Sequence, residues 1–227
     1  DAHSTIDPTE ERWRLFTVWN VRDSSTNAAE EGVSPAPEIV AAASVFFFTR
    51  WLQGQAHLVL KVCQVLVLPP HRRQGHASSL LRCIYAYAKE QNAVEITVED
   101  PCPAFRFVRD VVDLRLCQEL NLLIPEESGS ALHETQRAVA RKALRITEEQ
   151  IARCYEMQAF RMLEEAIRKL PVQGSSSDDK DANARAEELK RAFRLNVKRR
   201  LNKKHEEVLK AMSDPQARKA ELDVLYQ

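Results

Sequence analysis

The hydrophobic pattern of the chain changes its period at a single proline pair. Residues 58–68 (LVLKVCQVLVL) form an apolar run of strand length, which Pro69-Pro70 ends because proline cannot donate to a sheet ladder. Apolar side chains then recur at helical spacing, at Leu80, Leu81, Ile84 and Ala88. Residues 93–98 (AVEITV) return to a strand pattern. This order predicts a βαβ unit, in which two parallel strands are connected by a helix that covers the sheet.

Other strand patterns precede this unit, at residues 13–21 (WRLFTVWNV) and 38–50 (EIVAAASVFFFTR). Residues 103–120 follow it with the spacing of a helix. We therefore predict an α/β (α+β) domain over residues 1–124, with a mixed, mostly antiparallel sheet that feeds into the βαβ unit.

The remaining residues, 125–227, predict a C-terminal helical domain. Thr147-Glu148-Glu149-Gln150 is a capping box, which marks the start of a helix. Residues 171–183 (PVQGSSSDDKDAN) predict a polar linker, and an apolar stripe predicts a last helix over residues 184–212. Basic side chains are dense on that helix and would suit nucleic acid or an acidic chaperone, but a solvated helix with ion pairs to nearby glutamates is the commoner arrangement.

Composition narrows the class of protein further. The 227 residues carry 33 basic and 33 acidic side chains, so bulk charge gives no reason to expect a DNA-binding or membrane-binding protein. No apolar run approaches the ~20 residues of a membrane span. The five cysteines are odd in number and form no C-x-x-C pair, which argues against a disulfide framework or a zinc site and favours a reducing compartment. Because the sequence opens on Asp1 rather than Met, we expect a fragment of a longer protein.

The junction after the third strand has the features of an anion-binding loop. Residues 71–77 (HRRQGHA) combine two arginines with a glycine directly before a predicted helix, and helix N-termini present unpaired N–H groups. Gly75 lets the backbone approach a phosphate, and Ala77 keeps the first helical turn uncrowded. The alternative is an ordinary strand-to-helix turn with exposed arginines, which this loop alone does not exclude.

The pattern Arg72-x-x-Gly75-x-Ala77 resembles the acetyl-coenzyme A loop of the GNAT N-acetyltransferase superfamily. More narrowly, the chain is similar to the catalytic subunits of type B histone acetyltransferases. The matching positions are Gln64, Leu66, Leu68, Pro70, Gln74-Gly75-His76, Ile96-Thr97, Glu99-Asp100-Pro101, Arg109-Asp110 and Leu116-Cys117-Gln118. The chain departs from that family at Ala77, where glycine is usual, and at Arg73, which replaces a small residue and must point away from the phosphates. Compared with that family, we also expect the N-terminal domain to lie outside this sequence.

The resemblance implies a GNAT-type fold that uses acetyl-CoA as co-substrate and no metal. The pantetheine arm would bind the main chain of Gln64, Val65 and Leu66 in a cleft where the third and fourth strands part. The pyrophosphate would lie on the loop formed by His71, Arg72, Arg73, Gln74, Gly75, His76 and Ala77.

The resemblance also implies roles in catalysis. Glu99 would be the general base, with Asp100 assisting through orientation or charge, and Asp1 falls where the family has a further acidic residue. The alternative for Glu99-Asp100-Pro101 is a strand-ending turn. Val45, Phe46 and Phe47 fall where the family lays the peptide substrate, although packing in the core is an equally good interpretation.

By resemblance, the chain would acetylate lysines in the tails of newly synthesised, free core histones, chiefly the fourth core histone. The family further implies a β-propeller histone-binding chaperone subunit as partner, and a location in nucleus and cytoplasm. Two alternatives stay open. One alternative is a non-catalytic GNAT-like scaffold of a histone chaperone complex. The other is an acetyltransferase for another protein or amine.

Overall fold

The computed structural model describes residues 9–21, 37–126, 131–170 and 177–226. The chain divides into two compact units. The first comprises residues 1–120 and 138–151, and the second comprises residues 121–137 and 152–227. Residues 138–151, which the sequence analysis assigns to the C-terminal domain, thus cluster with the first unit.

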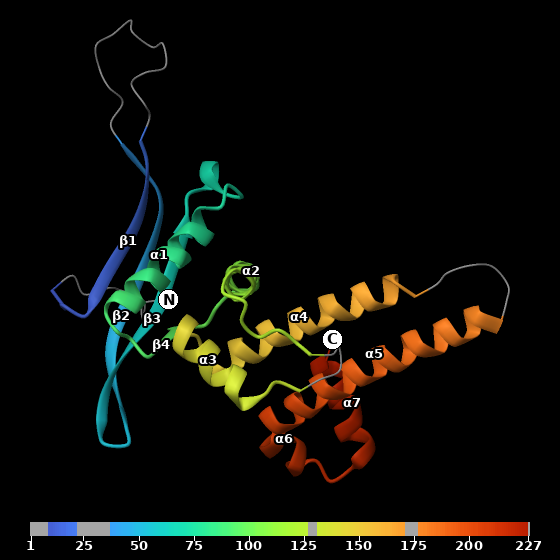
Figure 1. The fold of residues 1–227 in the computed structure, drawn as a ribbon. Helices are drawn as coiled ribbons and strands as arrows, with labels where there is room; N and C mark the ends of the chain where they lie inside the picture. The colour runs from blue at the N-terminus through green and yellow to red at the C-terminus, as the bar shows by residue number, and fades with distance from the viewer. Residues whose placement is uncertain (1–8, 22–36, 127–130, 171–176, 227) are drawn as a thin grey trace, which may run out of the picture. The chain divides into compact units, whose positions relative to one another are not determined.

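The first unit is built on a sheet with the strand order β1-β2-β3-β4 (Figure 1). The strands are β1 (Trp13–Asn20), β2 (Glu38–Leu52), β3 (Gln55–Val67) and β4 (Glu95–Val98). The first three strands are antiparallel neighbours, and β4 pairs with β3 in parallel. This is the predicted mixed, mostly antiparallel sheet.

The β2–β3 hairpin is longer than the sequence pattern indicates. Its two-residue turn, Gln53-Gly54, has positive φ at both positions (50° and 77°), the backbone that matches the twist of a hairpin. The strands therefore extend to Leu52 and from Gln55, beyond the apolar residues from which they were predicted.

Helix α1 (His76–Glu90) packs against all four strands of the sheet. Its buried residues follow the predicted helical stripe: Leu80, Leu81, Ile84, Tyr85 and Ala88. On the sheet, Phe16 and Phe47 contact the Tyr87 ring of α1, with centroids 5.4 and 5.9 Å away. The face of the sheet that carries Phe47 is therefore the one that α1 covers.

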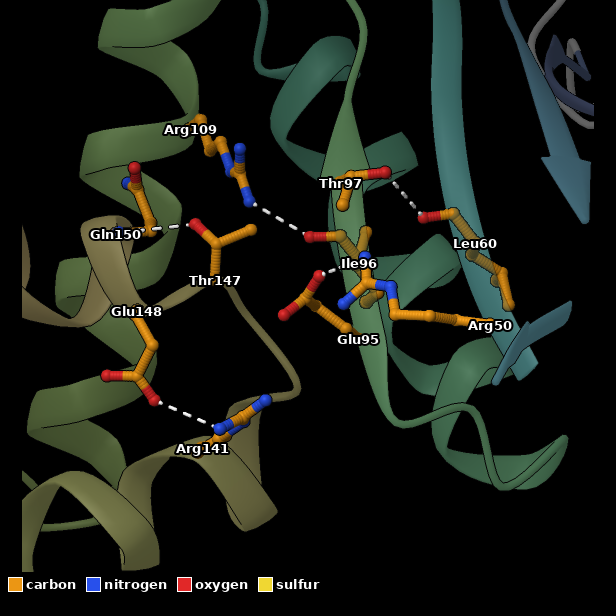
Figure 2. Close-up of polar contacts among 10 residues, drawn as sticks. All are labelled: Arg50, Leu60, Glu95, Ile96, Thr97, Arg109, Arg141, Thr147, Glu148 and Gln150. Carbon is orange, nitrogen blue, oxygen red and sulfur yellow. Dashed lines mark hydrogen bonds and ion pairs between the residues drawn. The ribbon is translucent and has the colours of Figure 1, made fainter. Parts of the chain in front are cut away.

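Helix α2 (Pro103–Glu119) and residues 145–146 hold β4 in place. Arg109 donates to the carbonyl of Ile96 at 3.2 Å (Figure 2). Ile96 also forms a parallel bridge with Ile146. On the other side, the Thr97 hydroxyl donates to the carbonyl of Leu60, and Arg50 forms an ion pair with Glu95 at 2.7 Å. Strand β4 is thus held by contacts along both of its edges and by the interactions of its own Glu95 and Thr97 side chains.

The second unit is helical. Its elements are the first turn of α3 (Glu134–Leu144), most of α4 (Glu148–Arg168), α5 (Ser177–Lys204), α6 (Glu206–Ala211) and α7 (Pro215–Tyr226). Its core contains Ala159, Leu163, Phe193, Val197 and Leu201. Among the residues that the structure describes, no helix is both long enough and apolar enough to cross a membrane.

Two expectations for this region were wrong. The predicted linker 171–183 is helical from Ser177 onward, while residues 171–176 lie outside the described part. The single helix predicted to end near residue 212 is divided at His205 into α5 and α6. Serine and aspartate favour linkers by composition, but the same residues are also good helix starts.

Candidate active site

The sheet opens where β4 ends. The parallel pairing runs only from Val59–Glu95 to Val62–Val98, and the backbone N–H of Glu99 makes the last contact, 2.9 Å from the carbonyl of Val62. Strand β3 continues to Val67. A register shift against β2 falls at the same point, because Ser44 pairs with Gln64 but Val45 pairs with Val62. Cys63 is therefore a bulge residue, and bulges bend a strand away from its neighbour.

A cleft of about 720 Å³ lies beside the free part of β3. The strand, the loop before α1 and the first turns of α1 and α2 all contribute to its walls. Its lining residues include Val65, Leu66, His71, Arg72, Arg73, Gly75, His76, Ala77, Cys102, Phe105 and Phe107. The structure thus brings together eight of the ten residues predicted to bind acetyl-CoA.

The other two, Gln64 and Gln74, do not line this cleft. The side-chain carbonyl of Gln64 accepts a hydrogen bond from the Ser44 hydroxyl at 3.3 Å, across the β2–β3 pair. Gln74 donates its side-chain amide to the carbonyl of Pro70 at 3.2 Å and thereby closes the loop. Main-chain binding of pantetheine at Gln64 would not need its side chain and stays a prediction.

The loop before α1 has the backbone that an anion site needs. Gly75 is the N-cap of α1 in the left-handed region (φ 88°), and no side chain forms a capping hydrogen bond there. A Cβ atom at Gly75 would meet nothing within 4 Å, so its φ rather than crowding favours glycine. The first turn of α1 contains no acidic residue. Its N–H groups and the positive end of the helix dipole therefore face a cleft without a competing carboxylate from that turn.

Arg73 also has a positive φ, at 63°, which is uncommon for a residue other than glycine. It is exposed and lines the cleft, as does Arg72. The Nε atom of Arg72 lies 3.3 Å from the carbonyl of Val67, so that guanidinium is tied to the end of β3.

A second, smaller cavity of about 170 Å³ adjoins the first, and the two share the lining residues Val65, Cys102 and Phe105. The predicted acid pair lines it: Glu99, whose side chain is 54% exposed, and Asp100, in the left-handed region at φ 35°. Aspartate tolerates that conformation better than most residues. A carboxylate thus lines the cavity that adjoins the cleft.

Cys63 lies beside this carboxylate. The pKa of the Cys63 thiol is raised to about 11, chiefly by burial and in addition by a hydrogen bond and charge repulsion from Glu99. A thiol is a poor nucleophile in this state, because the thiolate is the reactive form. The raised pKa therefore argues against acetyl transfer through the Cys63 thiol.

Several residues of the site escaped the sequence analysis. Phe105 and Phe107 of α2 line the cleft, and Phe107 is 70% exposed. Lys61 lies with its Nζ atom 3.4 Å from Oε1 of Glu99.

The three residues predicted to contact a peptide substrate are on β2 and line neither cavity. Val45 is completely buried, so its side chain belongs to the core. Phe46 packs against Trp13, with ring centroids 4.9 Å apart, and Phe47 packs against α1. Their role in binding a peptide stays a prediction. Asp1 lies outside the described residues.

No group of three or more metal-ligating side chains occurs among the described residues.

Comparison with known proteins agrees with this geometry. Residues 2–108 match the acetyltransferase (GNAT) family. The chain is 31% identical to the histone acetyltransferase type B catalytic subunit of Pyricularia oryzae, over 88% of this chain and 48% of that protein. The protein of the same name from Homo sapiens is 28% identical, over 88% of this chain and 41% of its own length. The chain therefore spans less than half the length of these relatives.

Among solved structures, the tetramutant of the BH1408 protein from Bacillus halodurans has a TM-score of 0.35 at 15% identity, covering 45% of this chain and 60% of that one. An acetyltransferase from Vibrio fischeri has a TM-score of 0.26 at 21% identity, covering 27% and 52%. From the family match and the curated relatives, we conclude that the chain carries an acetyltransferase domain of the GNAT family and is a relative of the type B histone acetyltransferase catalytic subunits.

Proposed function

We propose that this chain is a histone lysine N-acetyltransferase that transfers the acetyl group from acetyl-CoA directly to the acceptor amine. The observation that carries the proposal is the junction of two cavities at the parting of β3 and β4. One is lined by a phosphate-type loop, and the other contains Glu99. The names of the curated relatives support a histone as substrate.

The residues present fit the co-substrate. Main-chain groups on the open edge of β3, beyond the end of β4, would pair with the amide groups of the pantetheine arm, as a further strand would. The uncapped N-terminus of α1 after Gly75 suits the pyrophosphate, and Arg72 and Arg73 add positive charge. The thioester would then lie near Val65 and Cys102, which belong to both cavities.

Glu99 would act as the general base. A lysine of ordinary pKa is about 3 units above physiological pH, so the neutral amine costs roughly 4 kcal/mol. A carboxylate within reach, directly or through a water, takes the proton as the amine nitrogen attacks the thioester carbon. The carbon–sulfur bond breaks, and the CoA sulfur leaves and is protonated. Asp100, at the strand end, would orient the incoming ammonium.

The first test is calorimetric titration with acetyl-CoA and with desulfo-CoA. We expect micromolar binding that Gly75→Glu abolishes, because a carboxylate would then stand where the pyrophosphate binds. Gly54→Glu is the matched control, since Gly54 also has a positive φ with open space around it but lies in the β2–β3 turn. Binding that survives Gly75→Glu, or that Gly54→Glu equally abolishes, would contradict the assignment of the loop.

A second test measures turnover on core-histone tail peptides. Glu99→Gln removes the base but keeps the shape, so we expect kcat to fall roughly 10²- to 10⁴-fold, with binding of acetyl-CoA retained. If binding is retained but the wild-type chain shows no turnover, the scaffold alternative gains. Turnover on small amines or other protein tails, but not on histone peptides, would favour the alternative of another acceptor.

The finer assignments belong to this proposal as well. We propose the tail of the fourth core histone as the main acceptor, a β-propeller histone-binding chaperone as partner, and a location in nucleus and cytoplasm. Pull-down of the full-length protein with histones and chaperones tests the partner.

A further inference from the structure

Lys61, a lysine of this chain, lies next to Glu99, the proposed base. Lys61 lies on β3 opposite Thr97 of β4, and Glu99 follows Thr97 by two residues. Side chains two apart on a strand project from the same face. The Lys61 ammonium and the Glu99 carboxylate therefore project on one face of the sheet at the point where the strands part, and Nζ lies 3.4 Å from Oε1.

The position of this amine is defined by more than one contact. Its Nζ atom also lies 5.9 Å from the centroid of the Phe48 ring, within the range of a cation–π interaction. The side chain is 35% exposed, so the amine is neither enclosed nor fully free in solvent. Cys63, two residues after Lys61 on β3, lines the Glu99 cavity. The charges of Lys61 and Glu99 both act on its thiol.

An acceptor amine has two geometric requirements in direct acetyl transfer. It must lie within hydrogen-bond reach of the base, directly or through a water, and it must be able to approach the thioester carbon. Lys61 meets the first requirement, because its Nζ atom donates a hydrogen bond to Oε1 of Glu99 at 3.4 Å. Its flexible four-carbon side chain, which lies beside Glu99, can satisfy the second by changing rotamers.

We propose that Lys61 is an internal acetylation site of this enzyme. The inference rests on the proposed function, since it uses the same base and co-substrate. The Lys61 ammonium gives one proton to Glu99, which passes it to solvent, and the neutral nitrogen forms a bond to the carbonyl carbon of acetyl-CoA. The carbon–sulfur bond breaks, the nitrogen loses its second proton to Glu99, and the CoA thiolate takes up that proton. The products are Nε-acetyl-Lys61 and CoA, with the carboxylate restored.

Acetylation at this position changes the site. The amide of acetyl-lysine carries no charge, so Glu99 loses its ion pair and becomes available to the ammonium of another acceptor. Until it is acetylated, Lys61 competes with that acceptor for the same carboxylate. We therefore expect a lag in peptide acetylation by unmodified enzyme, which prior incubation with acetyl-CoA shortens.

The test is site-resolved mass spectrometry of the whole chain incubated with acetyl-CoA alone. We expect acetyl-Lys61 to form at a first-order rate that does not change when the protein is diluted, as an intramolecular reaction requires. Lys89 is the matched internal control, because it is an exposed lysine at the end of α1. Glu99→Gln should abolish acetylation of Lys61 and leave the slow chemical background at Lys89 unchanged.

The variants separate this inference from a purely structural ion pair. Lys61→Arg keeps the charge but cannot be acetylated, so we expect it to slow peptide turnover persistently and to abolish the effect of prior incubation. Lys61→Gln, which imitates the acetylated side chain, should show no lag. Lys89→Arg should behave as the wild type.

The failures of the two proposals are distinguishable. If the wild-type chain acetylates a histone tail peptide but Lys61 is modified no faster than Lys89, the internal site is wrong and the proposed function stands. If acetyl-CoA binds but neither the peptide nor Lys61 is acetylated, both proposals fail. Modification of Lys61 that survives Glu99→Gln also overturns the inference.

Discussion

At the scale of single residues, the most unusual group is a carboxyl buried beneath the sheet edge. Asp113 of α2 is fully buried, and its Oδ2 atom lies 3.6 Å from Nε of Arg109, which is longer than a good hydrogen bond. Burial raises the pKa of Asp113 from 3.8 to about 6, and the nearby Arg109 charge offsets only part of this. Arg109 is the residue that holds the carbonyl of Ile96, so the strand before Glu99 depends on this pair.

The raised pKa predicts how stability depends on pH. Between pH 3.8 and about 6 the folded state holds a proton on Asp113 that the unfolded state has lost, so this group's stabilisation decreases as pH rises through that window. The difference corresponds to roughly 3 kcal/mol by the usual conversion. Asp113→Asn cannot ionise, so its free energy of unfolding should rise relative to the wild type from pH 4 to pH 7. Urea denaturation of both proteins across this range measures it, and parallel curves would contradict the assignment.

At the scale of elements, the sequence predicts well wherever one period dominates. The four strands and helices α1 and α2 match their patterns because each buries one stripe or face in a single core. Helices α3 and α7 escaped prediction. Their buried or half-buried apolar stripes are short, with Ala140 and Leu144 on α3 and Leu222, Leu225 and Tyr226 on α7, while Val139 and Val224 are more than half exposed. Helix α5 begins inside a segment of linker composition for a similar reason, since polarity alone does not separate a linker from a solvated helix.

The residues of the candidate site also fall into two groups, those that the sequence predicts and those that only the tertiary structure brings to the site. The places of Gly75 and Glu99 could be predicted, Gly75 from the strand-to-helix turn that needs its backbone and Glu99 from the resemblance of its motif, while their roles stay predictions. Lys61 and Phe107 reach the site only through the register of β3 against β4 and the direction of α2, which are tertiary properties. The contribution of Cys63 depends on a bulge, which no periodicity indicates.

At the scale of the whole molecule, the two compact units predict where a ligand acts. A ligand that binds only the folded state stabilises the unit that holds it, by about 2.7 kcal/mol at a hundredfold excess over Kd. Acetyl-CoA should therefore slow hydrogen exchange in β3, α1 and the start of α2, which line the cleft. Exchange in α5 and α7 should change much less, because both belong to the second unit. Equal protection in both units, read by mass spectrometry, would contradict this division.

Residues 138–151 cluster with the first unit, and this affects where the chain can be truncated for expression. Ile146 completes the sheet beside Ile96, and the Gln150 side chain donates to Asp110 at 2.8 Å. A clone that stops after the apparent end of the catalytic region, near residue 124, would leave the β4 edge unpaired and available to other chains. An expression boundary beyond Ile151 keeps that edge covered, and aggregation of a shorter product would then reflect the cut rather than the enzyme.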